Sequence, residues 1–537
     1  NNRVNYSTNP DLSNSSWSSW QNNTQNPKIK LWSLQPNTTY YYRVYSYNPD
    51  NSSIYSNSSI YNFTTQECIS YKLVNATDTS ITGIDHPIQE ALDMICLDGG
   101  VVELNNGTFN ISTPIRIRES NITFRGQGMD KTIINQITEQ EDAIVIGKFD
   151  DPISRDGWLY ENSILMEALL EWFKNHPEEI IQDVQVKRMT VNVKDAAGPY
   201  DLFASIAGTE AINVTISEIK GTGNPQTADR NDDSVGVCFG HSIDITVKDC
   251  ILYGYGYNAK SFLSCHRINF LYNTLSQTKG WNSLEYNGVW PLRADWKPED
   301  GFSGNKDYDF GPNNPGSVIK GNKIYNGGSI IYVYSSYNVS VTENYISGTY
   351  SNHFPIQFWS STKKLVASYN IIHNCKCGGI GITMATGAFG DIECEIYGNV
   401  IYDNKYYGGG GQAGHGISIF RSPQERTTIY ANIHSNTIVD NDGDGIYNPY
   451  AWPVDATNNI IVNNGGYGIN GENITSTYNN IWNNTAGNYN QESAGEGDIS
   501  VDPLFADPDN GDFHLKSEAG RWNGTDWVND NETSPCI

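Results

Sequence analysis

The chain has 537 residues, only 18% of them charged, and a formal net charge of −26. This acidity argues against nucleic acid as a partner, and no apolar run is long enough to cross a membrane as a helix. The many Gly (50) and Tyr (34) residues, with only 5 Met, are typical of an extracellular strand-rich solenoid. We therefore expect an extracellular or cell-surface location.

The first segment, residues 1–66, contains Leu34-x-Pro36-x-Thr38-Thr39-Tyr40. This pattern resembles the tyrosine corner of fibronectin type III domains, which are β-sandwiches. The opening strands of such a domain are missing, so we expect a partial fibronectin type III-like segment. Its expected role is spacing or attachment.

The second segment, residues 67–537, contains a repeat in which a short alternating apolar run is followed by Asn, a second short run, and Gly or Asn. Equivalent apolar positions such as Val318, Val339, Leu365 and Ile392 lie mostly 21 to 37 residues apart. Strands this short cannot bury a face alone, so successive units have to stack around a shared core. The repeat predicts an all-β fold, a right-handed parallel β-helix, in which stacked Asn side chains bond along the axis.

Two amphipathic stretches predict helices within this segment. Residues 87–97 precede the first strands and would cap the open end of the first coil. Residues 163–175 place apolar side chains on one stripe and would form an inserted helix.

A long loop is expected at 284–317, because the repeat is interrupted there by a Gly- and Pro-rich stretch. It contains Trp290, Arg293 and Trp296. Aromatic faces stack on sugar rings and cations hold carboxylates, which favours substrate binding over simple packing. The complete set of expected substrate-binding residues is Trp290, Arg293, Trp296, Trp359, His415 and Arg421.

The nine cysteines are an odd number, so at least one thiol has no partner within the chain. Cys238, Cys250 and Cys265 fall in neighbouring coils, which favours stacking as small core residues over disulfides. Cys375-x-Cys377 lacks the spacing of a zinc site.

The catalytic candidates come from aligning coils. Asp232-Asp233 opens a strand with the spacing found in polygalacturonase-like glycosidases, where neighbouring carboxylates raise each other's pKa as acid catalysis requires. Lys260 is expected at nearly the same place one coil later and Glu285 one coil further. We predict Asp232, Asp233, Lys260 and Glu285 as the catalytic set, with an Asn/Asp turn ladder as the structural alternative.

A second cluster is expected near the other end. Gly414-His415-Gly416 resembles the Gly-His-Gly strand of the same glycosidases, although several coils separate it from Asp232. His415 aligns with Asp444 of the next coil, which suits a proton shuttle or a turn contact. The run from Asp440 to Asp444 opens like a calcium loop, but its twelfth position is Ala451. We therefore expect no metal or cofactor. Calcium is the one metal ion for which the sequence contains a candidate loop.

The C-terminal stretch from Asp502-Pro503-Leu504-Phe505 to Ser534-Pro535-Cys536-Ile537 resembles the end of surface β-helix proteins of methanogenic archaea. Together with the coils and the fibronectin-like segment, it makes the chain similar to the disaggregatase family. That resemblance implies an endo-acting enzyme that depolymerises methanochondroitin, an anionic matrix polymer of uronate and N-acetylgalactosamine, and so disperses cell aggregates.

Three functions remain open at this point. Hydrolysis would use Asp232 or Asp233 as acid and Glu285 to activate water. β-Elimination would use Lys260 or Arg293 as base next to a neutralised uronate carboxylate. The third is a surface-layer or adhesive β-helix without activity.

Overall fold

A computed structural model of the chain places most of the residues that it describes in strands. The residues that it describes are 2–18, 29, 31, 34–48, 51–65, 67–76, 87–139, 141–148, 177, 180–194, 203–223, 234–255, 257–261, 265–278, 282–287, 316–328, 330–334, 338–350, 353–359, 364–383, 392–406, 414–420 and 428–537.

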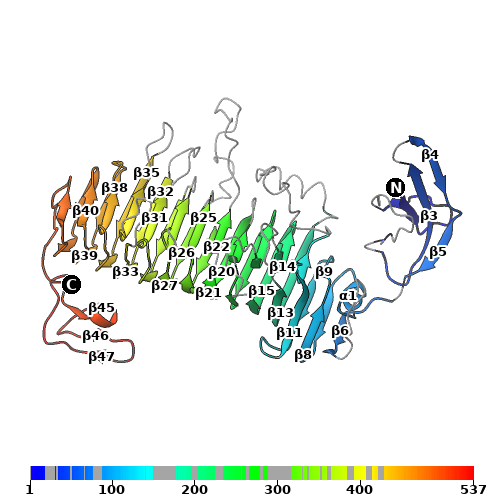
Figure 1. Ribbon diagram of the computed structural model, residues 1–537, viewed down its shortest axis with the longest axis horizontal. Helices are drawn as coiled ribbons and strands as arrows, with labels where there is room; N and C mark the ends of the chain where they lie inside the picture. Colours follow the sequence, from blue (N-terminus) through cyan, green and yellow to red (C-terminus); the bar gives the residue numbers. More distant parts are fainter. Residues whose placement is uncertain are drawn as a thin grey trace.

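The N-terminal segment forms one antiparallel sheet, at the blue end of the chain in Figure 1. Tyr40 is buried, and its hydroxyl accepts a hydrogen bond from the backbone N–H of Gln35 at 2.9 Å. This is the reach-back contact of a tyrosine corner. The described residues supply a single sheet here, so the fibronectin type III likeness stays a prediction. Its strands are β1 (Asn2–Ser7), β2 (Ser16–Trp17), β3 (Thr39–Asn48), β4 (Asn51–Asn57) and β5 (Tyr61–Thr64).

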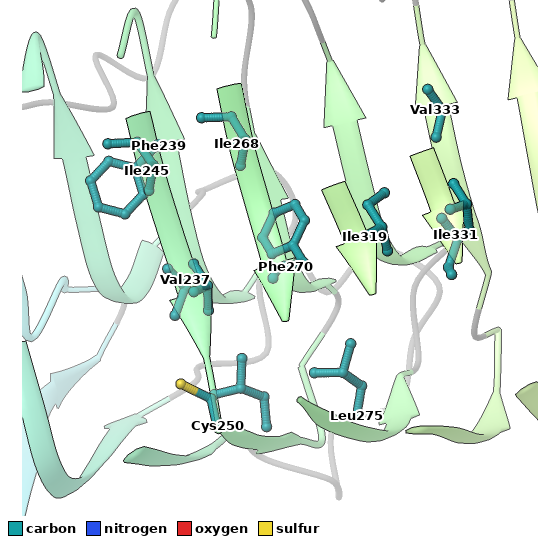
Figure 2. Packing of buried hydrophobic residues seen from close by; sticks show 14 of the residues in the cluster. Val237, Phe239, Ile245, Cys250, Ile268, Phe270, Leu275, Ile319, Ile331 and Val333 are labelled. Atoms are coloured by element: carbon teal, nitrogen blue, oxygen red, sulfur yellow. The ribbon is translucent and has the colours of Figure 1, made fainter. Parts of the chain in front are cut away.

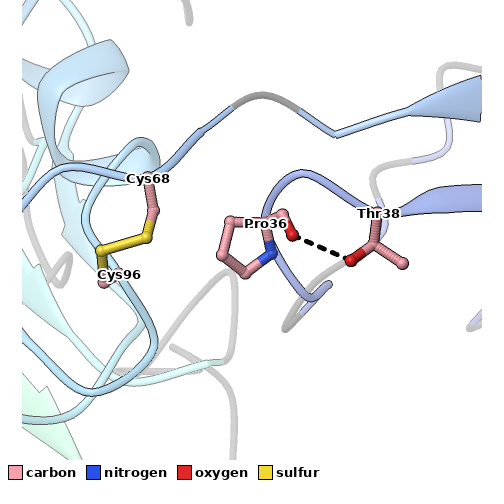
Figure 3. The surroundings of a disulfide bond; sticks show 4 residues. All are labelled: Pro36, Thr38, Cys68 and Cys96. Carbon is pink, nitrogen blue, oxygen red and sulfur yellow. Dashed lines mark hydrogen bonds between the residues drawn. A yellow bond between two sulfur atoms is a disulfide. The ribbon is translucent and has the colours of Figure 1, made fainter.

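A short helix, α1 (Pro87–Asp93), covers the start of the coils with Ile88, Ala91 and Leu92 buried. The helix predicted over 87–97 is therefore too long, because Ile95 already forms a parallel bridge with Ile69. A disulfide between Cys68 and Cys96 ties the incoming chain to the end of this cap (Figure 3). The inserted helix expected at 163–175 lies outside the described residues.

The main body is the predicted parallel β-helix, with successive coils running from cyan to orange in Figure 1. Each regular coil contributes two consecutive strands to a 25-stranded sheet and one strand to a 13-stranded sheet. The larger sheet contains β6 (Tyr71–Val74), β7 (Gly100–Leu104), β8 (Gly107–Ile111), β10 (Ile122–Arg125), β11 (Thr132–Glu139), β13 (Ile181–Lys194), β15 (Ala211–Thr222), β17 (Ile243–Lys248), β18 (Ile251–Tyr253), β20 (His266–Leu271), β21 (Thr274–Thr278), β23 (Ser317–Lys320), β24 (Lys323–Gly327), β26 (Val339–Thr342), β27 (Tyr345–Thr349), β29 (Lys364–Ser368), β30 (Ile371–His373), β32 (Ile392–Tyr397), β33 (Val400–Tyr402), β35 (Ile429–His434), β36 (Thr437–Val439), β38 (Val454–Thr457), β39 (Ile460–Val462), β41 (Ile474–Thr477) and β42 (Asn480–Trp482).

The 13-stranded sheet closes the coil on the remaining side. The loop expected at 284–317 begins later than predicted, since the strand β22 continues to Asn287. The strands are β9 (Ile115–Ile117), β12 (Ile144–Ile146), β14 (Phe203–Thr209), β16 (Ser234–Gly240), β19 (Tyr257–Ser261), β22 (Asn282–Asn287), β25 (Ile331–Tyr334), β28 (Ile356–Trp359), β31 (Ile380–Thr383), β34 (Ile417–Phe420), β37 (Ile446–Asn448), β40 (Tyr467–Gly471) and β43 (Gly487–Asn490).

The core consists of apolar rows that run along the axis, because each inward position repeats from coil to coil. Figure 2 shows this stacking for Phe270 and Ile319, which pair in register on β20 and β23. Cys238, Cys250, Cys265, Cys375, Cys377 and Cys394 are all buried, as the small-core-residue interpretation predicts. The Cys68–Cys96 disulfide was not predicted.

The corner between the two strands that each coil gives to the 25-stranded sheet has the same form in every coil from β17–β18 to β41–β42. It consists of two residues, the first left-handed and the second buried, such as Tyr369 (φ 54°) and Asn370. Asn370 donates from Nδ2 to Asn399 Oδ1 at 2.9 Å and accepts from Asn344 Nδ2 at 3.0 Å. The same bond joins Asn273, Asn322, Asn344, Asn370, Asn399, Asn436, Asn459 and Asn479 into one ladder that ends on Asp498.

The chain ends in two small antiparallel hairpins, β44–β45 and β46–β47, drawn in red in Figure 1. Phe505 of the first hairpin packs with Val439 and Val462 on the outside of the last coils. No helix in the described parts of the chain is long and apolar enough to span a membrane. The elements are β44 (Phe505–Asp507), η4 (Pro508–Asn510), β45 (Asp512–Leu515), β46 (Arg521–Trp522) and β47 (Trp527–Val528).

Candidate functional site

The outer face of the 13-stranded sheet carries a row of mostly polar residues along the axis. On β28, Ile356 and Phe358 enter the core, so Gln357 between them faces outward, and the neighbouring strands follow the same alternation. In register with Gln357 lie Tyr332, Gly381, Ser418, Tyr447 and Asn470, and we call these six residues the outer row.

The predicted catalytic residues meet this row only in part. Lys260 and Glu285 are backbone partners on β19 and β22, and Glu285 pairs with Tyr332, so both continue the outer row toward the N-terminus. Lys260 does not align with the strand entrance where Asp232 and Asp233 were expected to meet it. It pairs with Cys238, which lies well inside β16.

Several predicted site residues lie outside what the structure describes. They are Asp232, Asp233, Trp290, Arg293, Trp296 and Arg421. Trp359 ends β28, and its backbone pairs with Tyr334 and Thr383 on either side. The side chains of Lys260, Glu285 and Trp359 are likewise outside the description, so these residues are placed by register alone.

Register separates the two predicted clusters. Four coil-to-coil steps separate Glu285 from Ser418, which is about 19 Å at the usual strand spacing. Residues of both clusters therefore cannot contact the same glycosidic bond. The clusters therefore share one face as two places along an extended surface.

His415 and Asp444 form a buried pair beside the outer row. Glycines flank each of them directly before β34 and β37, and both side chains are less than a tenth exposed. His415 Nδ1 accepts the backbone N–H of Asp444 at 3.0 Å and lies 3.3 Å from Asp444 Oδ2. The imidazole also stacks on Tyr447, with ring centroids 4.2 Å apart. The coil alignment predicts this pairing, and the structure contains it.

Asp444 is held as a carboxylate. Burial alone raises the pKa of this carboxyl group, but the adjacent His415 and hydrogen bonds from Asn470 and the Tyr467 backbone outweigh burial, and the net pKa lies below its usual value. Asn470 Nδ2 donates to Oδ2 at 2.9 Å and the Tyr467 N–H to Oδ1 at 2.6 Å. A fixed carboxylate beside an imidazole orients the ring. The pair therefore presents an oriented imidazole beside the outer row.

A second polar cluster surrounds Gln357 and was not predicted. Gln357 is fully buried, donates from Nε2 to Thr383 Oγ1 at 2.7 Å, and pairs through Oε1 with His353 Nδ1 at 3.1 Å. Because an amide oxygen only accepts, His353 carries its proton on Nδ1. Burial lowers the pKa of His353, so this imidazole is neutral at pH 7.

Sequence reasoning missed this cluster because His353 precedes its strand in an irregular stretch. The available signal was the polar residue between two core residues in Ile356-Gln357-Phe358 and again in Ile417-Ser418-Ile419. Ser418 Oγ is buried and makes no hydrogen bond within the described residues. Aligning these triplets across coils would have located the outer row.

Two carboxylates of the run that resembles a calcium loop, Asp442 and Asp444, point to different partners. Asp442 accepts the Tyr406 backbone N–H at 2.9 Å and lies 3.6 Å from Lys405, whereas Asp444 holds His415. Across the described ranges, no group of three or more His, Cys, Asp or Glu residues is arranged to hold a metal ion.

A cavity of about 260 Å³ lies elsewhere, at the N-terminal end of the coils. Its lining combines Leu34 and Pro36 of the first segment with Leu92 of the cap and Arg116 of β9. This cavity belongs to the junction between the two segments and contains none of the outer row.

Comparison with known families gives one match. Residues 336–537 match the model of a family described as disaggregatase related. No curated protein matches the chain.

Several solved structures are similar to the chain at low sequence identity. The A-module of the mannuronan C-5 epimerase AlgE4 from Azotobacter vinelandii is 12% identical, with a TM-score of 0.37 over 72% of this chain and 97% of that one. The catalytic unit of a GH87 α-1,3-glucanase from Streptomyces thermodiastaticus is 12% identical, with a TM-score of 0.44 over 84% and 73%. The Dettilon tailspike protein is 13% identical, with a TM-score of 0.44 over 80% and 69%.

Proposed function

Because residues 336–537 match the model of the disaggregatase-related family, we propose that the chain is an extracellular, endo-acting enzyme that cleaves a matrix polysaccharide and disperses cell aggregates. The substrate class is an anionic polymer of uronate and N-acetylgalactosamine, similar to methanochondroitin. The observation that carries the proposal is the buried His415–Asp444 pair beside the outer row. A solenoid that served only as a spacer would have no use for a desolvated imidazole and carboxylate on one face.

The catalytic step that we propose is hydrolysis. One of Asp232 and Asp233 donates a proton to the leaving glycosidic oxygen, and Glu285 removes a proton from the water that attacks the anomeric carbon. Lys260, adjacent to Glu285 in register, would hold the uronate carboxylate.

Substrate binding would extend along the same face. His415 would bind the polymer at the far end of the outer row, and Trp359, Trp290, Trp296, Arg293 and Arg421 would stack on or pair with sugar units. An anionic polymer fits this arrangement because Lys260, Arg293 and Arg421 place positive charge on a chain that is acidic overall.

Elimination is the second candidate, since the Lys260–Glu285 register also suits a base next to a uronate. The base would take the proton from the carbon that bears the carboxylate, the C–O bond to the leaving sugar would break, and a C=C bond would form in the uronate.

The test incubates wild type and the Asp233→Asn variant with uronate-containing matrix polysaccharide, followed by size-exclusion chromatography with ultraviolet detection. We expect wild type to shorten the polymer without new absorbance, and the variant to lose at least about a hundredfold in rate. The exposed Asp526→Asn variant is the control and retains wild-type activity.

The outcomes separate the candidates. New ultraviolet absorbance with shortening would show elimination in place of hydrolysis. Binding without any shortening by wild type would contradict enzymatic function and favour an adhesive protein.

A further inference from the structure

Three tyrosines occupy a strained position at the corner between the paired strands of the 25-stranded sheet. Tyr272, Tyr369 and Tyr478 have φ values of 56°, 54° and 55°. This left-handed region is unfavourable for L-residues other than Gly, Asn and Asp. Backbone hydrogen bonds place all three on one line along the axis.

The turn itself does not require a ring. The same position is filled by Asp249, Glu343, Ser435 and Asn458 in other coils, all left-handed and followed by the buried ladder residue. Strain that the turn does not need points to a function for the side chain.

Each of these tyrosines is matched by a glycine one coil further on. A Cβ atom on Gly321 would collide with the ring of Tyr272, one on Gly398 with Tyr369, and one on Gly497 with Tyr478. The tyrosine ring therefore lies over the glycine backbone of the next coil, and this contact fixes the position of the ring. A residue with a side chain could not occupy the glycine position without moving the ring.

The rings are nevertheless largely open to solvent. Tyr272 is 53% exposed, Tyr369 57% and Tyr478 56%. Tyr369 also meets Tyr397 edge to face at 5.3 Å, and Tyr397 stacks on His434 at 5.0 Å, so the aromatic surface continues over two further coils. We call Tyr272, Tyr369 and Tyr478 the tyrosine ridge.

The spacing suits an extended ligand. Three coils separate Tyr272 from Tyr369 and four separate Tyr369 from Tyr478, about 14 Å and 19 Å along the axis. A globular partner would need a continuous apolar patch, whereas rings that stand far apart in a line match a linear polymer with repeating flat units.

We propose that the tyrosine ridge is a second polysaccharide-binding surface, at the corner of the coil opposite the 13-stranded sheet, and that it stacks on uncharged sugar rings. Asp249 lies on the same line, Glu343 pairs there with Lys320 at 2.9 Å, and Glu496 accepts a hydrogen bond from the Tyr478 hydroxyl at 3.3 Å. Asp249 and Glu496 repel an anionic chain and the Glu343–Lys320 pair is neutral, so the ridge takes N-acetylhexosamine-type or other neutral units. Stacking on such rings needs aromatic faces and no charge.

The experiment uses the full chain and replaces all three tyrosines by asparagine. Asn tolerates the left-handed conformation well, so the triple variant is expected to keep or raise the melting temperature. Affinity for a soluble N-acetylhexosamine oligosaccharide, measured by isothermal titration, is expected to fall at least tenfold. Replacing Tyr350, which is 60% exposed and lies off the ridge, by Asn is the matched control and leaves affinity unchanged.

The opposite pattern would overturn the proposal. If the rings only pack over glycine, the triple variant melts at a lower temperature and binds as wild type does. Absence of wild-type binding, or Tyr-dependent binding of unsulfated chondroitin alone, also overturns it. If the triple variant unfolds at the assay temperature, the three single variants decide. Each single variant is expected to bind the oligosaccharide about threefold more weakly. If all three bind as tightly as wild type, the proposal is refuted.

The ridge is independent of the proposed enzyme activity. A chain with Asp233→Asn is expected to retain binding at the ridge, and the triple Asn variant is expected to retain cleavage of short soluble substrates.

Discussion

The corners of the coil differ in how much the length of the connection between strands varies. The corner that holds the long Asn ladder has a constant length, whereas the two corners that flank the 13-stranded sheet do not. At the ladder corner, two residues connect the strands in every coil from β17 to β42. Beside the 13-stranded sheet, two residues connect β40 to β41, whereas residues 288–316 separate β22 from β23. The chain thus fixes its register along one edge and inserts variable sequence along the others.

This difference has a physical origin. A ladder amide bonds the coils before and after it, so a change in length would leave buried donors and acceptors unpaired. Buried Asn404, Asn441, Asn464 and Asn484 form a second, shorter ladder at the corner that leads into the 13-stranded sheet near the end of the coils. At the corner that leads out of this sheet, where residues 288–316 are inserted, loop length costs little free energy. Functional residues are expected where the connecting loops can vary in length. These loops flank the 13-stranded sheet, which carries the outer row, and we call this the variable side.

The largest effect is expected from a pair of single-residue insertions. One Ala between Gly398 and Asn399 should lower the free energy of unfolding by about 3 kcal/mol or more, because it breaks the register of the ladder. One Ala between Gly387 and Ala388 should change it by less than about 0.5 kcal/mol. Denaturant unfolding measures both, and equal effects would refute the contrast between the corners.

A smaller loss is expected from removing one ladder amide. Asn370→Ala should destabilise by about 2–4 kcal/mol, because Asn370 bonds Asn344, Asn399 and the carbonyl of Val341 in a buried site. The control is Asn432→Ala, whose side chain bonds Glu395 near the surface, with an expected change below about 0.5 kcal/mol. A cost for Asn370→Ala no larger than the control would mean that the ladder does not stabilise the coils.

The ladder end is expected to respond to pH. Asp498 accepts from Asn479, Ser476, Tyr489 and Gly495. Burial raises the pKa of Asp498, but these hydrogen bonds outweigh it and the folded-state pKa lies below the usual 3.8. The carboxylate therefore stabilises the fold above the unfolded pKa, and this contribution is lost as pH falls through the lower folded value.

Asp498→Asn should cost about 1–2 kcal/mol at pH 7 and less at pH 3. Melting curves between these pH values measure the difference. An undiminished cost at pH 3 would exclude the carboxylate charge as the cause.

The smallest effect concerns the variable side. Asp444→Asn should raise KM for the polymer about tenfold with kcat little changed, since the carboxylate orients His415, which is proposed to bind the polymer away from the catalytic carboxylates. Tyr406→Ala, near Asp442 but outside the pair, is the control. A fall in kcat with KM unchanged would contradict this binding role.

Sequence alone predicts the ladder side well. The alternating runs around Asn322, Asn344 and Asn436 repeat closely, and a two-residue corner leaves the chain no freedom to drift. The pairing of His415 with Asp444 was accessible because Gly414-His415-Gly416-Ile417 aligns residue by residue with Gly443-Asp444-Gly445-Ile446.

The variable side is less predictable. Lys260 was aligned with Asp233 by counting along irregular sequence, whereas hydrogen bonding sets it opposite Cys238. His353 joins Gln357 from outside any strand, and Cys68 meets Cys96 before the first regular coil, where no repeat constrains the alignment. Tertiary contacts of this kind have no periodic signal in the sequence.

The uniform ladder corner also makes the molecule modular. Residues 344–369 begin on one ladder Asn and end directly before the next, so their excision would join Glu343 to Asn370 and restore an equivalent corner. The outer row would then become shorter by one rung, about 4.8 Å. Duplication or deletion of such units in the gene would lengthen or shorten the outer row, and with it the length of polymer that the protein can contact.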